Sequence, residues 1–201
     1  MLNRESSKKM RGKDFITMGI FSAIYFVINF AVMLLGGFHP ILWIFMPAII
    51  AIFAAAPFLI MTAKVQKFGA VLLMGSITSL IYLATGQFTM VILITFAISC
   101  FLAELFRYKT GYNDIKGNIL VYAFYSMGMI GSPLPIWLFK DKFLAQIAEL
   151  GMPATYISQL EELTSPIILI LMVIAPFICS FIGVAIVKPL FKKHFEKAGI
   201  I

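Results

Sequence analysis

The sequence predicts an all-α integral membrane protein, a six-transmembrane-helix bundle with both termini in the cytoplasm. Hydrophobic residues make up 61% of the chain and charged residues only 12%, against about 25% in soluble domains. Residues 15–63 contain no Asp, Glu, Lys or Arg, and because about 20 apolar residues cross a bilayer, this stretch suffices for two spans. The basic residues fall between apolar runs, which is typical of topology signals and not of nucleic-acid binding.

The first two spans are expected at about 15–36 and 43–63. Between them lies Gly36-Gly37-Phe38-His39-Pro40, which interrupts a helix because glycine loses much conformational entropy and proline lacks a backbone donor. Short polar segments separate the remaining spans, which are expected at about 68–84, 88–106, 117–139 and 164–187. Residues 1–201 then form a single membrane domain, with a basic segment over 1–14 and a basic tail over 188–201.

The distribution of Lys and Arg agrees with this topology. With six spans, fourteen of the sixteen basic residues fall on the side of the two termini, and only Lys140 and Lys142 fall on the other side. Cytoplasmic segments of membrane proteins carry such an excess of positive charge. An odd number of spans would remove the asymmetry.

Residues 140–163 form the one long external segment. Phe143, Leu144 and Ile147 make an apolar stripe on a predicted short amphipathic helix that ends near Gly151, and a polar turn is expected after it. This helix either rests on the membrane surface or acts as a lid over an outward-facing cavity.

The motifs of catalysis and of ATP hydrolysis are missing. The sequence has no GxxxxGK[ST] loop and no HExxH pair, so we expect neither an enzyme nor a metal or cofactor site. Cys100 and Cys179 lie in predicted spans and form no disulfide or metal-ligand pattern. The one acidic residue inside a span is Glu104, and Arg107, three residues later, is expected to pair with it. An ion-coupled carrier, which needs buried charges, is therefore not favoured.

The chain is compact, its basic amino terminus leads into Asp14-Phe-Ile-Thr-Met-Gly-Ile-Phe-Ser-Ala-Ile-Tyr25, and it carries no energising motif. This combination of features resembles the substrate-binding S component of an energy-coupling factor (ECF) transporter, and more specifically the Trep_Strep branch of S components. The resemblance covers essentially the whole chain. It implies a bacterial plasma-membrane protein that captures a vitamin-like or other small nutrient outside and docks on a T component and two ATPase subunits.

Small residues are candidates for that docking surface. In the family, a small-xxx-small motif of the first span docks the T component, and its counterpart here is Gly19-x-x-x-Ala23. We add Ala51 and Ala55 of the second span, because small residues let helices approach closely in lipid. Packing within the chain is the alternative role for all four residues.

Uncharged polar and aromatic residues near the outer ends of the spans are candidates for substrate binding. They are Asn29, His39, Trp43, Gln87, Ser126, Ser132, Trp137 and Tyr156. Asn29 could instead bond a neighbouring helix, the two tryptophans could lie in the interfacial belt, and His39 could be a solvated loop residue or, with nearby methionines, a metal ligand. Two other functions remain open, an accessory membrane protein without a ligand and a stand-alone facilitator.

Overall fold

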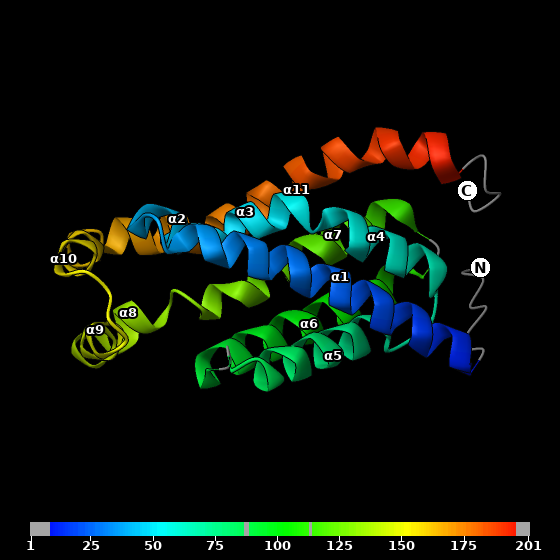
Figure 1. Cartoon of the computed structure of the whole chain (residues 1–201). Coiled ribbons are helices and arrows are strands. Elements are labelled where there is room, and N and C mark those ends of the chain that lie inside the picture. The colour runs from blue at the N-terminus through cyan, green and yellow to red at the C-terminus, as the bar shows by residue number, and fades with distance from the viewer. Residues whose placement is uncertain (1–8, 87–88, 113, 196–201) are drawn as a thin grey trace.

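The computed structural model describes residues 9–86, 89–112 and 114–195, and over these residues the chain forms helices and no strand (Figure 1). The all-helical prediction is confirmed. In chain order the elements are α1 (Gly12–Gly36), α2 (Pro40–Ile44), α3 (Met46–Phe53), α4 (Ala55–Lys64), α5 (Ala70–Ala84), α6 (Met90–Thr110), α7 (Ile115–Ser126), the 3₁₀ helix η1 (Met127–Gly131), α8 (Pro135–Leu138), α9 (Lys140–Glu149), α10 (Ala154–Glu162) and α11 (Pro166–Phe195).

Among the described residues, three helices are long and apolar enough to cross a membrane by themselves: α1, α6 and the Pro166–Pro189 part of α11. Their outer surfaces are apolar. Val27 on α1, Ile94 on α6 and Ile167 on α11 are each more than half exposed. Such extensive exposed apolar surface suits hydrocarbon and not water, so the chain is an integral membrane protein.

The span predicted over 43–63 is broken in the structure. Its residues belong to α2, α3 and α4, and the axes of α3 and α4 differ by 49°. The bend lies at Ala54, where Pro57 has no backbone N–H to donate to the carbonyl of Phe53. The bent pair is long enough for one further span.

The span predicted over 117–139 is also not one helix, because α7 passes into η1 and then α8. The 3₁₀ segment lies against α6: a Cβ atom on Gly131 would sit 2.6 Å from the Cα atom of Ile92. Thr95 of α6 donates its hydroxyl to the Gly128 carbonyl at 2.8 Å. Glycine is needed at position 131 because a side chain there would separate the two segments.

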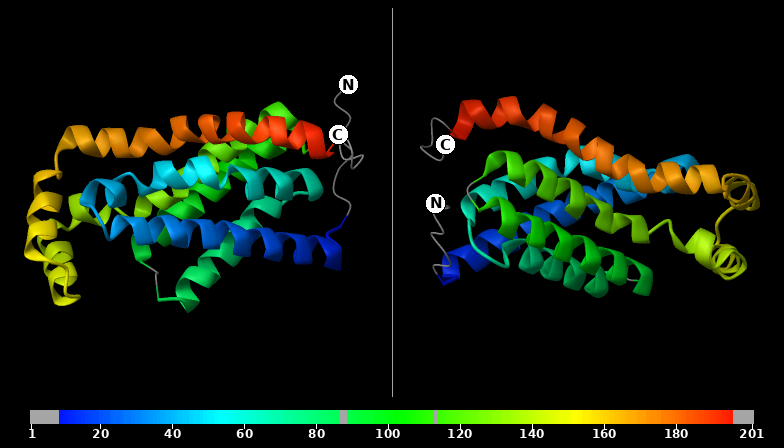
Figure 2. Two further views of the ribbon diagram at one scale, coloured as in Figure 1. Left: turned by 45° about the horizontal axis from the view of Figure 1, so that its top comes forward. Right: turned by 180° about the vertical axis from the view of Figure 1, so that it is seen from behind.

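The segment predicted to be external, residues 140–163, is helical over most of its length. α9 lies where a short helix was predicted, but the polar turn predicted after it is wrong, since residues 154–162 form α10. Tyr156 and Leu160 are one helical turn apart and both are buried, which gives α10 an apolar face. The two helices lie across the end of the bundle (Figure 2).

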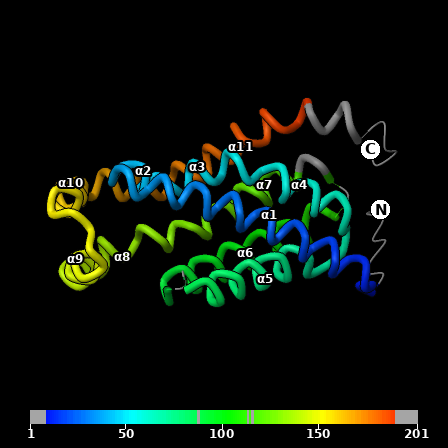
Figure 3. Tube along the Cα trace, viewed as in Figure 1, coloured from blue at the N-terminus to red at the C-terminus, as the bar shows by residue number. Residues whose placement is uncertain are grey.

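The start of α1, the end of α4 and the end of α11 lie together at the end opposite α9 and α10 (Figure 1). α3 packs along α11, α1 packs against α4 and α5, and α6 packs against α7 and η1. The α5–α6 pair turns back before it reaches the level of α9 (Figure 3). One large core fills the bundle, and a second, smaller core containing Ile44, Ile136 and Leu160 lies beneath α9 and α10.

Candidate functional site

Four polar side chains meet inside the bundle. Tyr25 and Asn29 come from α1, Tyr82 from α5 and Tyr125 from α7, and none is more than 1% exposed. We call these four residues the tyrosine cluster. Asn29 was predicted as a substrate contact, whereas the three tyrosines were not. Their signal in the sequence was a tyrosine within an apolar span, which for Tyr25 and Tyr125 lies away from the interface where tyrosine is usually found.

Aromatic rings enclose the tyrosine cluster. The ring of Tyr125 lies 5.3 Å from that of Tyr25, 4.6 Å from that of Phe58 and 5.3 Å from that of Phe96, centroid to centroid. Tyr82 lies edge-on to Phe26 at 5.0 Å. These distances are typical of favourable aromatic pairs. Helices α1, α4, α5, α6 and α7 therefore all contribute a wall or a polar group.

Four polar atoms of the tyrosine cluster have no hydrogen-bond partner that meets ordinary distance and angle limits: the hydroxyls of Tyr25, Tyr82 and Tyr125 and Oδ1 of Asn29. Four other buried atoms in the described residues, on Arg107, Tyr112 and Asn118, also have none. The Asn29 amide nitrogen donates to the Tyr25 carbonyl at 2.6 Å, within the same helix. An unpaired polar group away from water costs about 1–3 kcal/mol, so four in one place call for an explanation.

Neighbouring polar side chains of the same spans do have partners. The Tyr122 hydroxyl, three residues from Tyr125, donates to the Ala51 carbonyl at 2.7 Å. Ser22 donates to the Met74 carbonyl at 3.2 Å, and Thr78 donates to the same oxygen at 2.8 Å. The bundle therefore satisfies polar groups next to the tyrosine cluster but not those within it.

Helices α9 and α10, which we call the outer cap after the predicted topology, contact the bundle through a few specific interactions. The Tyr156 hydroxyl donates to the Gly36 carbonyl at 2.7 Å, and the ring of Phe143 stacks on Trp43 at 5.3 Å. Lys140 and Glu161 form an exposed ion pair at 2.9 Å that links α9 to α10. Burial raises the pKa of Tyr156 to about 12, so its hydroxyl remains a donor at neutral pH.

The remaining residues predicted to contact substrate do not form one site. His39 is exposed, and its Nδ1 accepts from the Ile41 backbone at the start of α2. Ser126 donates to the carbonyls of Ala123 and Pro176 inside the bundle. Trp137 donates its ring N–H to the Ser165 carbonyl at 3.2 Å.

Four further residues complete the predicted set. Ser132 is half-buried at the end of η1. Trp43 and Tyr156 hold the outer cap, so their observed contacts are with other parts of the chain. Gln87 lies outside the described residues. Within the described chain, no three His, Cys, Asp or Glu side chains gather as metal ligands do.

The four predicted docking residues lie on two different surfaces. Gly19 is partly exposed and Ala23 is exposed, both on the outer face of α1. Ala51 and Ala55 are fully buried. A Cβ atom on Gly183 of α11 would lie only 2.7 Å from the Ala51 carbonyl oxygen, which shows how closely α11 covers α3. Ala51 and Ala55 therefore pack within the chain, and their assignment to a docking face is corrected.

At the end of the bundle opposite the outer cap, which we call the inner end after the predicted topology, the predicted ion pair between Glu104 and Arg107 is not formed. The carboxylate oxygens of Glu104 accept from the backbone N–H groups of Gly69, just before α5, at 2.8 Å and of Val71, in its first turn, at 3.0 Å. Arg107 donates to the carbonyls of Thr62 at 2.8 Å and Val65 at 2.9 Å. One side chain therefore caps the start of α5 and the other caps the end of α4.

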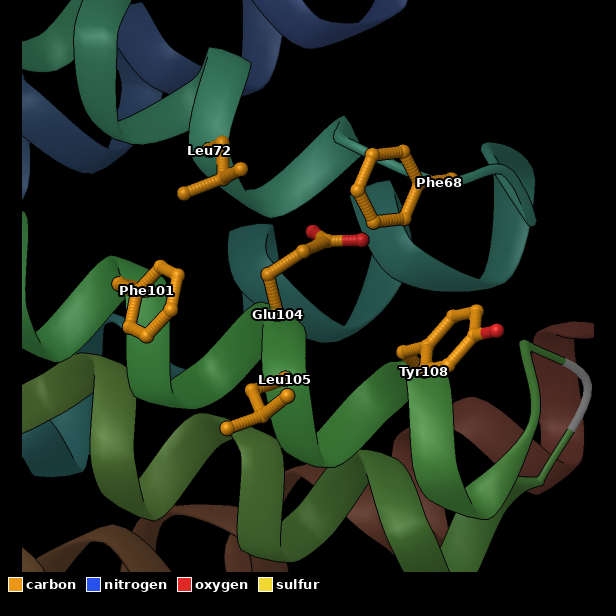
Figure 4. A pocket seen from close by; sticks show the side chains of 6 residues that line it. All are labelled: Phe68, Leu72, Phe101, Glu104, Leu105 and Tyr108. Carbon is orange, nitrogen blue, oxygen red and sulfur yellow. The ribbon is translucent and has the colours of Figure 1, made fainter.

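A shallow apolar groove of about 330 Å³ lies on the outer side of α5 and α6 near this inner end (Figure 4). It is lined by Phe68, Leu72, Phe101, Glu104, Leu105 and Tyr108. Glu104 is the acidic residue of this groove, and both of its carboxylate oxygens already accept hydrogen bonds from backbone N–H groups. The groove offers a ligand little beyond apolar contact, so we place the candidate site at the tyrosine cluster.

Comparison with known protein families shows to which family this chain belongs. The sequence model of the family described as "Hypothetical bacterial integral membrane protein (Trep_Strep)" matches residues 12–197. The chain belongs to the Trep_Strep family. No curated protein and no solved structure matches this Trep_Strep chain. The family and the apolar helices agree that the protein resides in a membrane.

Proposed function

We propose that this Trep_Strep protein is the substrate-binding S component of an ATP-driven ECF-type importer of a vitamin-like or other small nutrient. The observation that carries the proposal is the tyrosine cluster: uncharged polar groups without partners, buried in an apolar bundle whose end is covered by the outer cap. Such a bundle supplies contacts for a ligand and no energising motif. Energy for uptake therefore comes from separate subunits.

The proposed topology has six spans and cytoplasmic termini in the bacterial plasma membrane. α1, α3–α4, α5, α6, α7–η1 and α11 would each make one crossing. The basic residues support this orientation, because fourteen of the sixteen would be cytoplasmic. The outer cap would then face the outside, where it is placed to cover an entering nutrient.

Topology is tested by single cysteines in a background with Cys100 and Cys179 replaced by serine. Lys142→Cys on α9 should react with a membrane-impermeant maleimide added to intact cells. Lys64→Cys at the end of α4 should react only after the membrane is opened. Labelling of Lys64→Cys in intact cells would refute the cytoplasmic placement of this end.

The proposed partners are a T component and two ATPase subunits, with the exposed face of α1 as the docking surface. Gly19 and Ala23 lie there, and a Cβ atom on Gly19 would meet no atom of this chain within 4 Å. Small residues on an open helix face allow a partner helix to approach closely. The two buried alanines of α3 and α4 have no part in this surface.

Co-expression with a T component and two ATPases tests the function. We expect the four proteins to co-purify and to support ATP-dependent nutrient uptake in proteoliposomes. Ala23→Trp should abolish co-purification, whereas Ala31→Trp, at another exposed position of α1, should not. Co-purification that survives Ala23→Trp would refute the docking surface. Uptake by this chain alone would identify a facilitator, and a chain that binds no nutrient would be an accessory protein.

A further inference from the structure

We infer that the tyrosine cluster itself binds the ligand, and that the ligand is an uncharged molecule with a planar ring and hydrogen-bonding groups on its edge. The transport role of such a ligand rests on the proposed function. Binding does not, because it can be measured on the isolated chain. The inference concerns Tyr25, Asn29, Tyr82 and Tyr125, three of which the sequence did not single out.

The first step is the convergence of the unpaired groups. The ring of Tyr25 lies 5.3 Å from that of Tyr125, and Tyr82 lies edge-on at 5.0 Å to Phe26, the residue next to Tyr25. The side chains of Asn29 and Thr78 are the polar neighbours of the Tyr25 and Tyr125 hydroxyls, but neither contact meets the distance and angle limits of a hydrogen bond. These groups come from α1, α5 and α7, which are far apart in the sequence. Four of the eight buried polar atoms without a partner in the described residues thus belong to neighbouring side chains of one aromatic core.

The second step is the chemistry that these atoms offer. Three phenolic hydroxyls can donate to a carbonyl oxygen or ring nitrogen, and Oδ1 of Asn29 can accept from an N–H or O–H group. No member of the tyrosine cluster is charged, and a charged ligand would be buried there without a counter-charge. The complementary molecule is therefore neutral and carries both acceptors and a donor.

The third step is the shape of the walls. The rings of Phe58 and Phe96 lie 4.6 and 5.3 Å from the ring of Tyr125, centroid to centroid. A planar ligand can replace one such contact by stacking, because flat rings pack favourably on each other at these separations. An aliphatic ligand of equal polarity would lose that contribution.

The fourth step is access. The tyrosine cluster is fully buried, so side chains must move before a ligand enters. Tyr82 lies two residues before the end of α5, and the α5–α6 pair ends short of the outer cap (Figure 3). Tyr82 is thus the member of the tyrosine cluster that lies near the end of its own helix, and we place ligand entry at this end of α5.

Tyrosine-to-phenylalanine variants test the state of the hydroxyls without any ligand. Tyr25→Phe, Tyr82→Phe and Tyr125→Phe should leave the Tm of the detergent-purified chain unchanged or raised, because each removes an unpaired buried hydroxyl. The control Tyr122→Phe removes the bond to the Ala51 carbonyl and should lower Tm by about 2–4 °C. If the three variants lose as much stability as the control, the hydroxyls are already satisfied and the inference is overturned.

Ligand class is tested by stabilisation of the same purified chain with nicotinamide, hypoxanthine and lumichrome as neutral ring probes, and with nicotinate and Co²⁺ as charged probes. We expect a neutral ring to raise Tm, and its Kd to weaken by about tenfold in Tyr125→Phe but not in Tyr122→Phe. Stabilisation by the charged probes alone, or by no probe, overturns the inference. Co-purification with the T component and ATPases, which does not require these hydroxyls, tests the proposed function separately.

Discussion

Replacing Glu104 by glutamine should destabilise the folded protein by about 2–3 kcal/mol. Glu104 is only 2% exposed, and its two oxygens accept from the backbone N–H groups of Gly69 and Val71. Gly69 has a φ of 82° and no side chain, so the start of α5 has no local cap. Glutamine keeps the shape but turns an amide nitrogen toward one of these donors. One charge-assisted bond is then lost, which costs about 1.5–3 kcal/mol.

Alanine at position 104 should cost more, about 3–5 kcal/mol, because it leaves both backbone donors unpaired inside the bundle. The measurement is equilibrium unfolding in mixed detergent micelles, followed by circular dichroism. Glu149→Gln on the exposed surface of α9 is the matched control and should change the unfolding free energy by less than about 0.5 kcal/mol. If Glu104→Gln behaves like this control, the carboxylate is not the cap of α5 and our interpretation of the inner end is wrong.

Three further predictions concern the other contacts that hold the bundle. Arg107→Lys should cost about 2 kcal/mol in the same unfolding assay, because a lysine cannot reproduce the planar group that reaches two carbonyls at the end of α4. Gly183→Val should prevent folding or lower the free energy of unfolding by at least about 3 kcal/mol, since a Cβ atom would lie 2.5 Å from the Ile52 carbonyl oxygen. The control Gly19→Val should be tolerated, and equal expression and stability of the two variants would contradict this prediction. Tyr156→Phe should leave the bundle folded but raise the hydrogen-exchange rate of the α10 backbone amides by about fivefold, because it removes the hydrogen bond to the Gly36 carbonyl. An unchanged exchange rate would show that this hydrogen bond does not hold the outer cap.

The gross class of the protein could be predicted because it depends on local composition. A run of 49 residues without Asp, Glu, Lys or Arg, from 15 to 63, suits hydrocarbon whatever its neighbours are. The break near Gly36 and Pro40 and the amphipathic character of α9 are likewise properties of a few adjacent residues. The helix α10 was missed because its apolar face consists mainly of Tyr156 and Leu160, which become buried only through contact with the bundle.

The partners of polar residues could not be predicted in this way. The spacing of Glu104 and Arg107 favoured an ion pair, yet their hydrogen-bond partners lie 33 to 45 residues earlier in the chain. Bonds to orphan backbone groups at two helix ends are formed instead of one bond between the side chains, because those backbone groups would otherwise be unpaired inside the bundle. Nε and Nη1 of Arg107 have no hydrogen-bond partner in this arrangement. Spacing along one helix carries no information about the ends of its neighbours.

By itself, then, the sequence determined that the chain is helical and lies in a membrane, because hydropathy and helix breaks act over one or two turns. Only the tertiary structure decided which alanines are covered and which tyrosines meet. Ala51 lies beneath α11 while Ala23 faces outward, although both are alanines in apolar spans. The tyrosine cluster is assembled from three helices, and its unpaired hydroxyls exist only because the packing of those helices brings them together away from water.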